Sequence, residues 1–249
     1  MTETEADAAT ARGGSASIGQ PEYWWYVARS DLLRTVLAEH VGSPARVLDV
    51  GSADGPSVSW LRQHDGLHVT MDIDPRGLAA GGVCGSALQL PFADHSFDVV
   101  GAFDVLEHCE PEDVALREIA RVLAPGGRLL MSVPAYTWAW SDFDDANGHH
   151  RRYTVKRAER AIAAAGLQVE RSTYAFAGVF PFFAAERVAR RARAGVSKDR
   201  TAPEDIVSLP QVPAWMSKMF LSLSRVDRRV LRKRDLPFGS SVLVAAKKA

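Results

Sequence analysis

The segment that most constrains the fold of this chain is a short apolar stretch that runs into a turn of small residues. Residues 46–51 read RVLDVG, and the turn GSADG spans residues 51–55. Residues 56–63 then have helical character. Small residues let backbone N–H groups and the start of the following helix approach a ligand, so this arrangement is typical of nucleotide-binding sheets. By itself the turn is weak evidence, since a glycine turn also simply joins a strand to a helix.

A second strand with an acidic end strengthens the prediction. Residues 67–72 read LHVTMD, so that Asp72 ends this strand. A carboxylate at the tip of a buried strand needs hydrogen-bond donors, and the two hydroxyls of a ribose supply them. Strand, turn, helix, strand and acid together predict a nucleoside-binding half-domain.

Further apolar stretches alternate with segments of helical periodicity along the rest of the chain. Helices are predicted over residues 22–41, 112–123 and 154–165, and strands over residues 81–85, 97–103, 128–133, 167–174 and 241–246. This alternation predicts an α/β fold, a doubly wound, Rossmann-like parallel sheet of seven strands with helices on both faces.

The chain divides into three predicted parts. Residues 1–20 are small and polar, with no apolar segment typical of a signal peptide, and we expect a disordered tail there. Residues 21–177 and 240–249 are predicted to form the core domain. Residues 178–239 interrupt the alternation, and they are predicted to form a helical insertion before the last strand.

The charges are balanced overall but unevenly distributed. The chain has 30 basic and 30 acidic side chains, which argues against a nucleic-acid partner. Residues 1–185 carry 15 basic and 24 acidic side chains, whereas residues 186–234 carry 13 basic and 5 acidic ones. The insertion is therefore basic and amphipathic. Two interpretations stay open: a cap over a substrate pocket, or a surface that lies on an anionic membrane.

Cysteine content and hydropathy bear on the compartment. The chain has 2 cysteines, too few for a disulfide framework, which suits a reducing environment. No apolar run reaches the roughly 18 residues that a transmembrane helix needs. We therefore expect a cytoplasmic protein, with peripheral contact at a membrane surface through residues 178–239 as an open alternative.

The motifs together resemble the class I S-adenosylmethionine-dependent methyltransferases, and in particular the broad group that includes the quinone-biosynthesis methyltransferases. The resemblance covers about residues 22–175 and the last strand. It is carried by VLDVGSADG (47–55), VTMDID (69–74), LPFADHSFDVV (90–100), DVLEH (104–108), REIARVLAPGGRLLMSVP (117–134) and RRYTVKRAERAIAAAGLQV (151–169).

This resemblance implies an enzyme that transfers a methyl group from S-adenosylmethionine to a small-molecule or lipid-like acceptor. Two other classes remain open. The first is a non-catalytic cofactor-binding or interaction module on the same fold, because a fold alone does not define a function. The second and more remote class is an NAD-dependent dehydrogenase, whose loop normally carries a third glycine three residues after the second. The sequence predicts neither the acceptor atom nor the oligomeric state.

The resemblance also implies which residues bind the cofactor. Asp49 and Gly51 correspond to the site of its amino-acid end, Asp72 to the ribose carboxylate, and Ile73 to the residue packed on the adenine. The remaining positions are Ser52, Ala53 and Gly55 in the turn, Ser86 and Ala87 at the adenine edge, and Phe103 just past the fourth strand, beside the sulfonium. Two residues depart from the usual pattern: Ala53 replaces the middle glycine, and Ser86 replaces an adenine-binding aspartate.

The first predicted helix begins with four consecutive aromatic residues, YWWY at residues 23–26. The resemblance implies that this N-terminal helix forms a lid over the cofactor, with Trp25 and Arg29 in contact with it. The alternative is that these side chains only pack the helix on the domain. Helix neighbours point in different directions, so one buried stripe does not need all four rings.

Candidate groups for activating the acceptor lie after the fifth strand, at the edge where open α/β sheets bind ligands. His149 and His150 are the candidates for a general base or for a hydrogen-bond partner of the substrate, although a base is optional because positioning supplies much of the rate. Alternatively, they pair with Asp142, Asp144 or Asp145. No metal site is predicted, since neither cysteine nor a known ligand spacing accompanies the histidines. Glu107 is expected to brace the next helix.

Overall fold

The computed structural model describes residues 20–78, 80–194 and 211–249, so the tail predicted over residues 1–20 lies outside the described residues except for Gln20. The described strands are β1 (Arg46–Val50), β2 (Leu67–Asp72), β3 (Val83–Cys84), β4 (Phe97–Phe103), β5 (Leu123–Pro134), β6 (Leu167–Ala175) and β7 (Ser241–Lys248). The described α-helices are α3 (Trp24–Leu37), α4 (Glu112–Val122), α5 (Asp142–Ala146), α6 (Val155–Ala164), α7 (Phe180–Ala194) and α8 (Ala214–Leu231).

The strands form one seven-stranded sheet in the order β3-β2-β1-β4-β5-β7-β6. The predicted α/β fold with a Rossmann-like sheet of seven strands is confirmed. The expectation of an entirely parallel sheet is wrong, because β7 runs antiparallel to both β5 and β6. An apolar run such as SVLVAA predicts burial but does not encode strand direction, and β7 is buried over Val242–Ala246 between its two neighbours.

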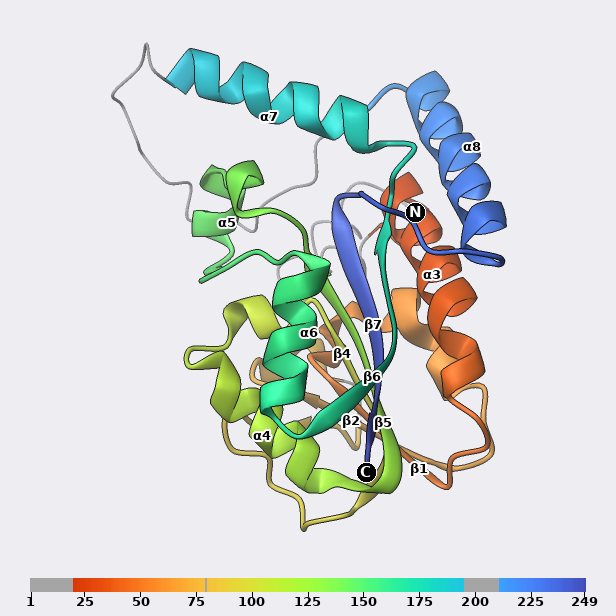
Figure 1. Cartoon of the computed structure of the whole chain (residues 1–249), viewed down its shortest axis with the longest axis vertical. Coiled ribbons are helices and arrows are strands. Elements are labelled where there is room, and N and C mark those ends of the chain that lie inside the picture. The colour runs from red at the N-terminus through yellow and green to blue at the C-terminus, as the bar shows by residue number, and fades with distance from the viewer. Residues whose placement is uncertain (1–19, 79, 195–210) are drawn as a thin grey trace.

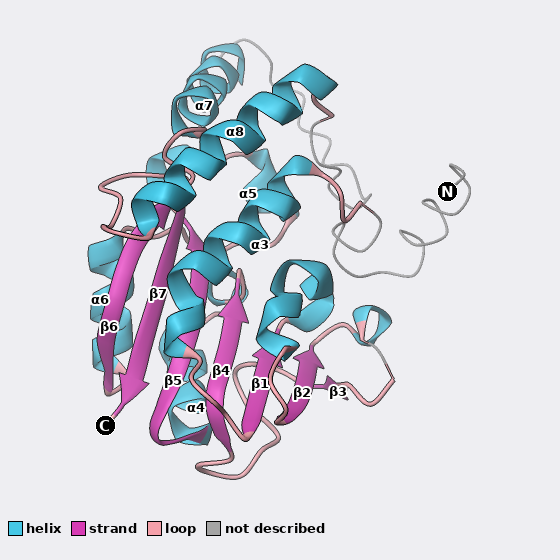
Figure 2. Cartoon of the chain, turned by 90° about the vertical axis from the view of Figure 1, so that its right-hand side faces the viewer, coloured by secondary structure: helices cyan, strands magenta, loops and turns pink. Residues whose placement is uncertain are grey.

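Helices cover both faces of the sheet, as predicted. The helices α4 and α6 lie on one face, and α3 lies on the other with α8 packed outside it (Figures 1 and 2). A 3₁₀ segment, η2 (Ser52–Arg62), shares the face of α3 and replaces the helix predicted over residues 56–63. Each face has its own apolar core, built around Ile119 and Ile162 on one side and around Leu33 and Leu61 on the other.

Local sequence signals account for the helix boundaries. The buried stripe of α4 recurs at helical spacing through Leu116 and Ile119. The Thr154 side chain caps α6 by accepting a hydrogen bond from the backbone N–H of Arg157 at 3.2 Å. Gly166 then ends this segment with a φ of 80°, a left-handed conformation that favours glycine.

The described part of the insertion consists of α7 and α8. In Figures 1 and 2, α7 lies beyond the carboxyl ends of the central strands. The helix α8 packs on α3, where the Trp24 and Phe220 ring centroids are 4.7 Å apart. Arg228 pairs with Asp31 at 2.8 Å across the same interface. None of the described helices combines the length and apolar character needed to cross a bilayer.

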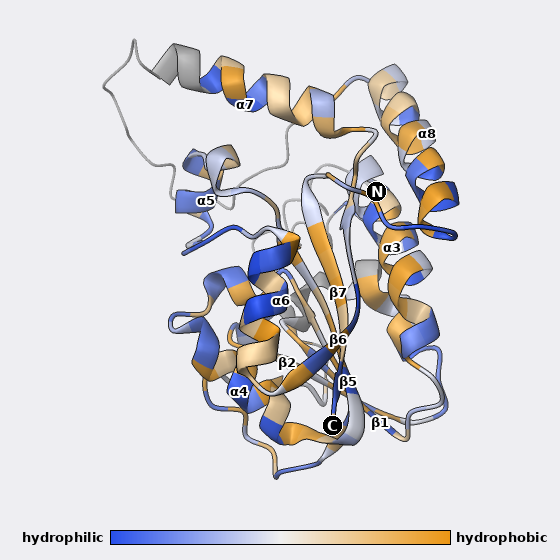
Figure 3. Cartoon of the chain, in the orientation of Figure 1, coloured by the Kyte–Doolittle hydropathy of each residue, from blue (hydrophilic) through white to orange (hydrophobic). Residues whose placement is uncertain are grey.

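The amphipathic character predicted for the insertion does not separate buried apolar from exposed polar side chains along α8. The helix buries Phe220, Ser224, Asp227 and Leu231, whereas the side chains of Trp215 and Val226 are 63% and 51% exposed. Asp227 turns inward because it accepts hydrogen bonds from the backbone N–H of Gly178 at 3.1 Å. Apolar and charged residues alternate along α8 (Figure 3). Large apolar side chains therefore lie on the exposed side of this helix as well as on its buried side.

Candidate functional site

The candidate site lies at the carboxyl edge of the central strands. The chain runs outward from β1 to β2 and β3 and then crosses to β4 on the other side of β1. Open α/β sheets bind ligands at such a reversal, because the loops after the two neighbouring strands diverge there. The predicted cofactor residues of the sheet lie near the carboxyl ends of β1, β2 and β4 or in the loops after β1, β2 and β3. These strand ends lie along one edge of the sheet (Figure 2).

The turn after β1 is fixed in place by Gly51. Its φ is 71°, and a Cβ atom there would collide with the side chain of Val105 in the loop after β4. Its backbone N–H donates to the carbonyl oxygen of Met71 at 2.8 Å. Gly51 thus holds the turn between the ends of β2 and β4 in a space that admits no side chain. Gly55 lies four residues further on, within η2, and the side chains of Ser52 and Ala53 are outside the described residues.

Asp72 ends β2 beside this turn and is 8% exposed. Its Oδ1 accepts a hydrogen bond from the backbone N–H of Asp74 at 2.9 Å, and its carbonyl oxygen accepts one from Gly85 at 2.9 Å. The next residue, Ile73, has a side chain that is 74% exposed. A nearly buried carboxylate and an exposed apolar side chain therefore stand next to each other at the edge of the sheet.

The other predicted cofactor positions differ in their surroundings. The Ser86 hydroxyl accepts a hydrogen bond from the N–H of Leu88 at 3.2 Å, and Ala87 packs on the core. Asp49 lies within β1, is 4% exposed, and has Arg62 of η2 at 3.6 Å. Phe103 is the last residue of β4, not the residue past it.

The Phe103 side chain is buried, and its ring contacts Trp60 edge to face at 6.2 Å between centroids. Its burial in the core beneath α3 leaves Asp104, with a φ of 58°, as the residue at the edge of the sheet.

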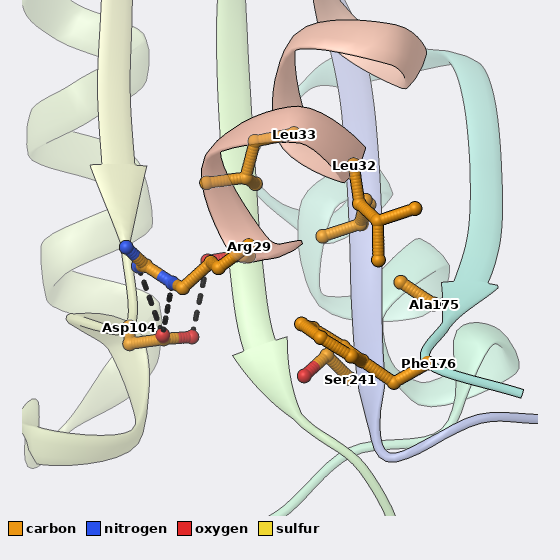
Figure 4. A pocket seen from close by; sticks show the side chains of 9 residues that line it. Arg29, Leu32, Leu33, Asp104, Ala175, Phe176 and Ser241 are labelled. Carbon is orange, nitrogen blue, oxygen red and sulfur yellow. Dashed lines mark hydrogen bonds and ion pairs between the residues drawn. The ribbon is translucent and has the colours of Figure 1, made fainter. Parts of the chain in front are cut away.

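A partly buried ion pair joins the first helix to the residue after β4. The Nε and Nη2 atoms of Arg29 lie 3.1 and 2.9 Å from Oδ2 of Asp104, and Ser132 donates to Oδ1 at 3.0 Å (Figure 4). The Arg29 guanidinium also lies 5.4 Å from the Trp25 ring centroid, and Trp25 stacks on Phe176. These contacts pack the helix on the domain, as the alternative interpretation predicted. Contact of Trp25 and Arg29 with a cofactor stays a prediction.

The two candidate histidines have different environments. The Nδ1 of His149 lies 2.8 Å from Oδ1 of the fully buried Asp144, which Arg152 also contacts at 2.7 and 3.1 Å. Burial alone would raise the pKa of Asp144, but hydrogen bonds from His149 and Arg152 outweigh it and lower that pKa. His150 is exposed, and its backbone N–H donates to the carbonyl oxygen of Glu107 at 2.8 Å.

The structure also brings together a group that the sequence analysis missed. Glu107 and His108 lie in η4 (Leu106–His108), after β4, and one ligand atom from each falls within 4.8 Å of the other and of one from His149. The two imidazole rings meet edge to face at 4.6 Å between centroids. Burial and the neighbouring His149 lower the pKa of His108.

Glu107 is 1% exposed, and its Oε2 has no hydrogen-bond partner within the described ranges of the chain. Burial, and then the charge of Asp104, raise its pKa well above the usual range. The N-cap residue of α4, Pro111, makes no side-chain cap hydrogen bond, and the expectation that Glu107 braces this helix stays a prediction. The sequence signal for this group was the pair Glu107-His108 after β4 together with His149 after β5. It was missed because these two loops are far apart in the sequence.

Comparisons with known proteins find a methyltransferase domain in the central part of the chain. A family model described as a methyltransferase domain matches residues 48–131. The demethylmenaquinone methyltransferase of Mycobacterium tuberculosis is 36% identical over 121 residues, covering 46% of this chain and 49% of that protein. The malonyl-[acyl-carrier protein] O-methyltransferase of Herminiimonas arsenicoxydans is 43% identical over 96 residues, covering 34% and 36%. The chain spans half or less of the length of these curated relatives.

Solved structures show the same fold over a longer part of the chain. The N-methyltransferase NodS of Bradyrhizobium japonicum, in complex with S-adenosyl-L-homocysteine, has a TM-score of 0.54 at 14% identity and covers 98% of this chain and 97% of that one. Phosphoethanolamine N-methyltransferase 2 of Haemonchus contortus, in complex with S-adenosyl-L-methionine, has a TM-score of 0.54 at 16% identity and covers 92% and 56%. The domain match and the curated relatives show that this chain contains a methyltransferase domain of the class I S-adenosylmethionine-dependent type, and the solved structures share its fold.

Proposed function

We propose that this chain transfers a methyl group from S-adenosylmethionine to a small-molecule or lipid-like acceptor. The observation that carries the proposal is the junction of Gly51 and Asp72. The N–H of Gly51 is hydrogen-bonded to the residue before Asp72, so a turn with no room for a side chain stands beside a nearly buried carboxylate. A nucleoside fits this combination, since its ribose donates two hydroxyl hydrogens to one carboxylate.

The chain's own residues suit the parts of that cofactor. In the proposed arrangement Asp72 accepts the ribose hydroxyls, and the exposed Ile73 covers one face of the adenine. Ser86 and Ala87 face the adenine edge, where a serine offers one hydroxyl in place of a carboxylate. The amino-acid end lies against Asp49 and the turn of Gly51, Ser52, Ala53 and Gly55. When bound, S-adenosylmethionine supplies an electrophilic methyl group.

The acceptor side is formed by the loop after β5. His149 is the proposed proton acceptor, because the carboxylate of Asp144 binds its Nδ1 and so orients the ring with Nε2 free for a substrate proton. Asp144 acts as a positioning residue that Arg152 fixes in turn. His150 is the weaker candidate, since its described link to this region is through its backbone.

The insertion covers the same loop. Phe183 of α7 lies under the Arg152 guanidinium at 6.0 Å, and Arg187 donates to the Ser141 hydroxyl at 2.7 Å. These contacts support a cap over the acceptor side, with α7 as its inner part. The exposed side chains of Trp215, Val226 and Arg229 on α8 support a further proposal, that this outer face contacts an anionic membrane that holds a lipid-like acceptor.

Transfer of a labelled methyl group tests the proposed activity. The full chain is incubated with S-adenosylmethionine labelled on the methyl group and a panel of phenol, quinol and carboxylate acceptors. We expect label in at least one acceptor, together with S-adenosylhomocysteine. Binding of the cofactor without transfer to any member of the panel would favour the non-catalytic module, and binding of NAD in place of S-adenosylmethionine would favour the dehydrogenase.

A further inference from the structure

We infer that Glu107, His108 and His149 bind a divalent transition-metal cation beside the methyl acceptor. The three side chains come from two loops at the carboxyl edge of the sheet, and one ligand atom from each lies within 4.8 Å of the other two. Ligands about 2.0–2.2 Å from a metal ion are separated from each other by roughly 3.0–3.4 Å. Small side-chain rotations would therefore close the group around an ion.

Hydrogen bonds to the backbone of η4 hold the two loops together independently of any ion. The backbone N–H of His150 donates to the carbonyl oxygen of Glu107 at 2.8 Å, and the Arg151 guanidinium donates to that of Leu106 at 3.2 Å. The two residues after His149 are thus fixed to η4, the segment that carries the other two side chains. A site whose ligands are already close binds a cation with little ordering of the chain.

Glu107 has the electrostatic character of a ligand that lacks its ion. The carboxylate is 1% exposed, and no described residue supplies a hydrogen-bond partner for Oε2. Burying a carboxyl group without a partner favours its neutral form, whereas a bound cation would stabilise the charged form. Buried polar groups are usually hydrogen-bonded, and buried charges are paired or coordinate metals. The two buried arginines whose charges act on Glu107 make their printed ion pairs with other carboxylates, Arg29 with Asp104 and Arg152 with Asp144.

Both histidines have an outer partner on one ring nitrogen. His149 binds Asp144 through Nδ1, and His108 has a hydrogen bond with the Asn147 backbone. Histidine ligands to metals typically make such a bond to a carboxylate or carbonyl, which orients the ring and leaves the other nitrogen for the ion. Arg152 fixes Asp144 from the far side.

The ligand set indicates the class of cation. Two imidazoles and one carboxylate suit zinc, iron, manganese or cobalt better than calcium or magnesium, which prefer sets made entirely of oxygen. Three protein ligands also leave positions open for a substrate. His108 and His149 are the ligands most specific to this class.

This inference rests on the proposed function and narrows its acceptor to one with a hydroxyl. A cation at this site would lower the pKa of a nearby substrate hydroxyl. The hydroxyl proton leaves to solvent, the oxygen forms a bond to the methyl carbon, and the carbon–sulfur bond breaks with its electron pair staying on sulfur. With the ion bound, His149 serves as a ligand, and this replaces the role of proton acceptor proposed above while the methyl transfer itself is unchanged.

Metal titration of the full chain tests the site without measuring activity. Chelator-treated protein is titrated with Zn²⁺ by calorimetry and with Co²⁺ by visible absorption, which reports imidazole coordination. We expect one ion per chain. We also expect affinity to fall at least about 10-fold in Glu107→Gln, His108→Ala and His149→Ala, as expected for removing a ligand or its close support. His150→Ala, next to His149 but exposed, should keep the wild-type affinity.

Two outcomes would overturn the inference: no stoichiometric binding of either ion, or unchanged affinity in both Glu107→Gln and His149→Ala. Glutamine resembles the protonated glutamate in shape, so Glu107→Gln is expected to fold, and the exposed His108 provides a second variant. Titration with S-adenosylmethionine is run on the same samples. Loss of metal binding with cofactor binding retained refutes only the metal site, whereas absent cofactor binding refutes the proposed function.

Discussion

The Nδ1 atom of His149 lies 2.8 Å from the Oδ1 atom of Asp144, a carboxylate with no exposed surface. The sequence left two alternatives for His149, a role toward the substrate or a pairing with an aspartate, and this contact makes them compatible. The histidine does pair with an aspartate of its own loop. The same pairing orients its ring, as a general base or a metal ligand both require.

The first prediction concerns the stability that Asp144 provides. Asp144→Ala leaves the buried Arg152 without its partner, which typically costs about 3–5 kcal/mol in the free energy of unfolding. Chemical denaturation measures the change. Asp142→Ala, at an exposed position of the same helix, is the control and should cost clearly less, because interactions of an exposed carboxylate are weakened by water. Equal effects of the two substitutions would contradict the structural role of Asp144.

The same residue predicts a pH dependence of stability. The pKa of Asp144 is lowered in the folded protein, so its contribution is present above the unfolded value of about 3.9. That contribution is lost as the pH falls toward the folded value. Wild type should therefore lose stability below about pH 4 more steeply than Asp144→Asn. Parallel curves for the two proteins would argue against the coupling.

The second prediction separates the two candidate histidines. If His149 acts on the acceptor as a base or as a ligand, His149→Ala should lower kcat by about 10²–10⁴-fold with cofactor affinity preserved. His150→Ala should stay within a few-fold of wild type, because its described contact with η4 uses the backbone. Steady-state kinetics and titration with S-adenosylmethionine measure both quantities. A large loss in His150→Ala alone would reverse the assignment.

The third prediction concerns the turn after β1. In Gly51→Ala, the added Cβ collides with Val105 and the alanine must adopt a left-handed backbone conformation. In Gly42→Ala, only the left-handed conformation is unfavourable, since nothing lies within 4 Å of a Cβ there. A left-handed alanine costs about 1–2 kcal/mol, and overpacking adds about 1–3 kcal/mol. Gly51→Ala should therefore be the more destabilised variant in thermal unfolding, and it should also bind S-adenosylmethionine more weakly. Similar losses in both variants would show that the contact with Val105 is unimportant.

The fourth prediction tests the outer face of α8. Trp215, Val226 and Arg229 are exposed, so we expect co-sedimentation with anionic vesicles, reduced at high salt and absent with neutral vesicles. Arg229→Glu combined with Trp215→Ala should weaken it. Arg228 is a poorer choice because it pairs with Asp31. Phe220→Ala is the matched contrast, since it would open a cavity beside Trp24 and lower stability without removing the exposed face. Failure to bind any vesicle would contradict the proposed membrane contact and leave the cap as the only proposed role of the insertion.

Most of the fold is encoded locally and was therefore predictable. The caps at Thr154 and Gly166, the buried stripe of α4 and the position of β7 all follow from periodicity and turn residues. The direction of β7 and the buried face of α8 depend on tertiary partners instead. The Asp227 side chain points inward, where its carboxylate accepts a hydrogen bond from the backbone N–H of Gly178.

Some of the site residues were likewise predictable from local sequence, whereas others meet only through the tertiary structure. The turn at Gly51 and the carboxylate of Asp72 are adjacent because β1 and β2, which are consecutive in the sequence, pair in parallel. Recognising the two strands was therefore enough to predict that these residues lie side by side. Glu107 and His149 meet because β5 lies next to β4, which joins loops far apart in sequence. Spacing rules for metal ligands search one segment at a time, and so they missed this group.

The central claim, that the carboxyl edge binds S-adenosylmethionine through Asp72, is tested most directly by calorimetric titration of wild type and Asp72→Ala. Loss of a charged hydrogen-bond partner should weaken binding by about 1.5–3 kcal/mol, or roughly 10- to 150-fold, with the thermal unfolding curve little changed. Asp74→Ala, a carboxylate of the same loop that pairs with Arg76, should bind as wild type does. Equal affinity of wild type and Asp72→Ala, or no binding by either, would contradict the assignment of the cofactor site.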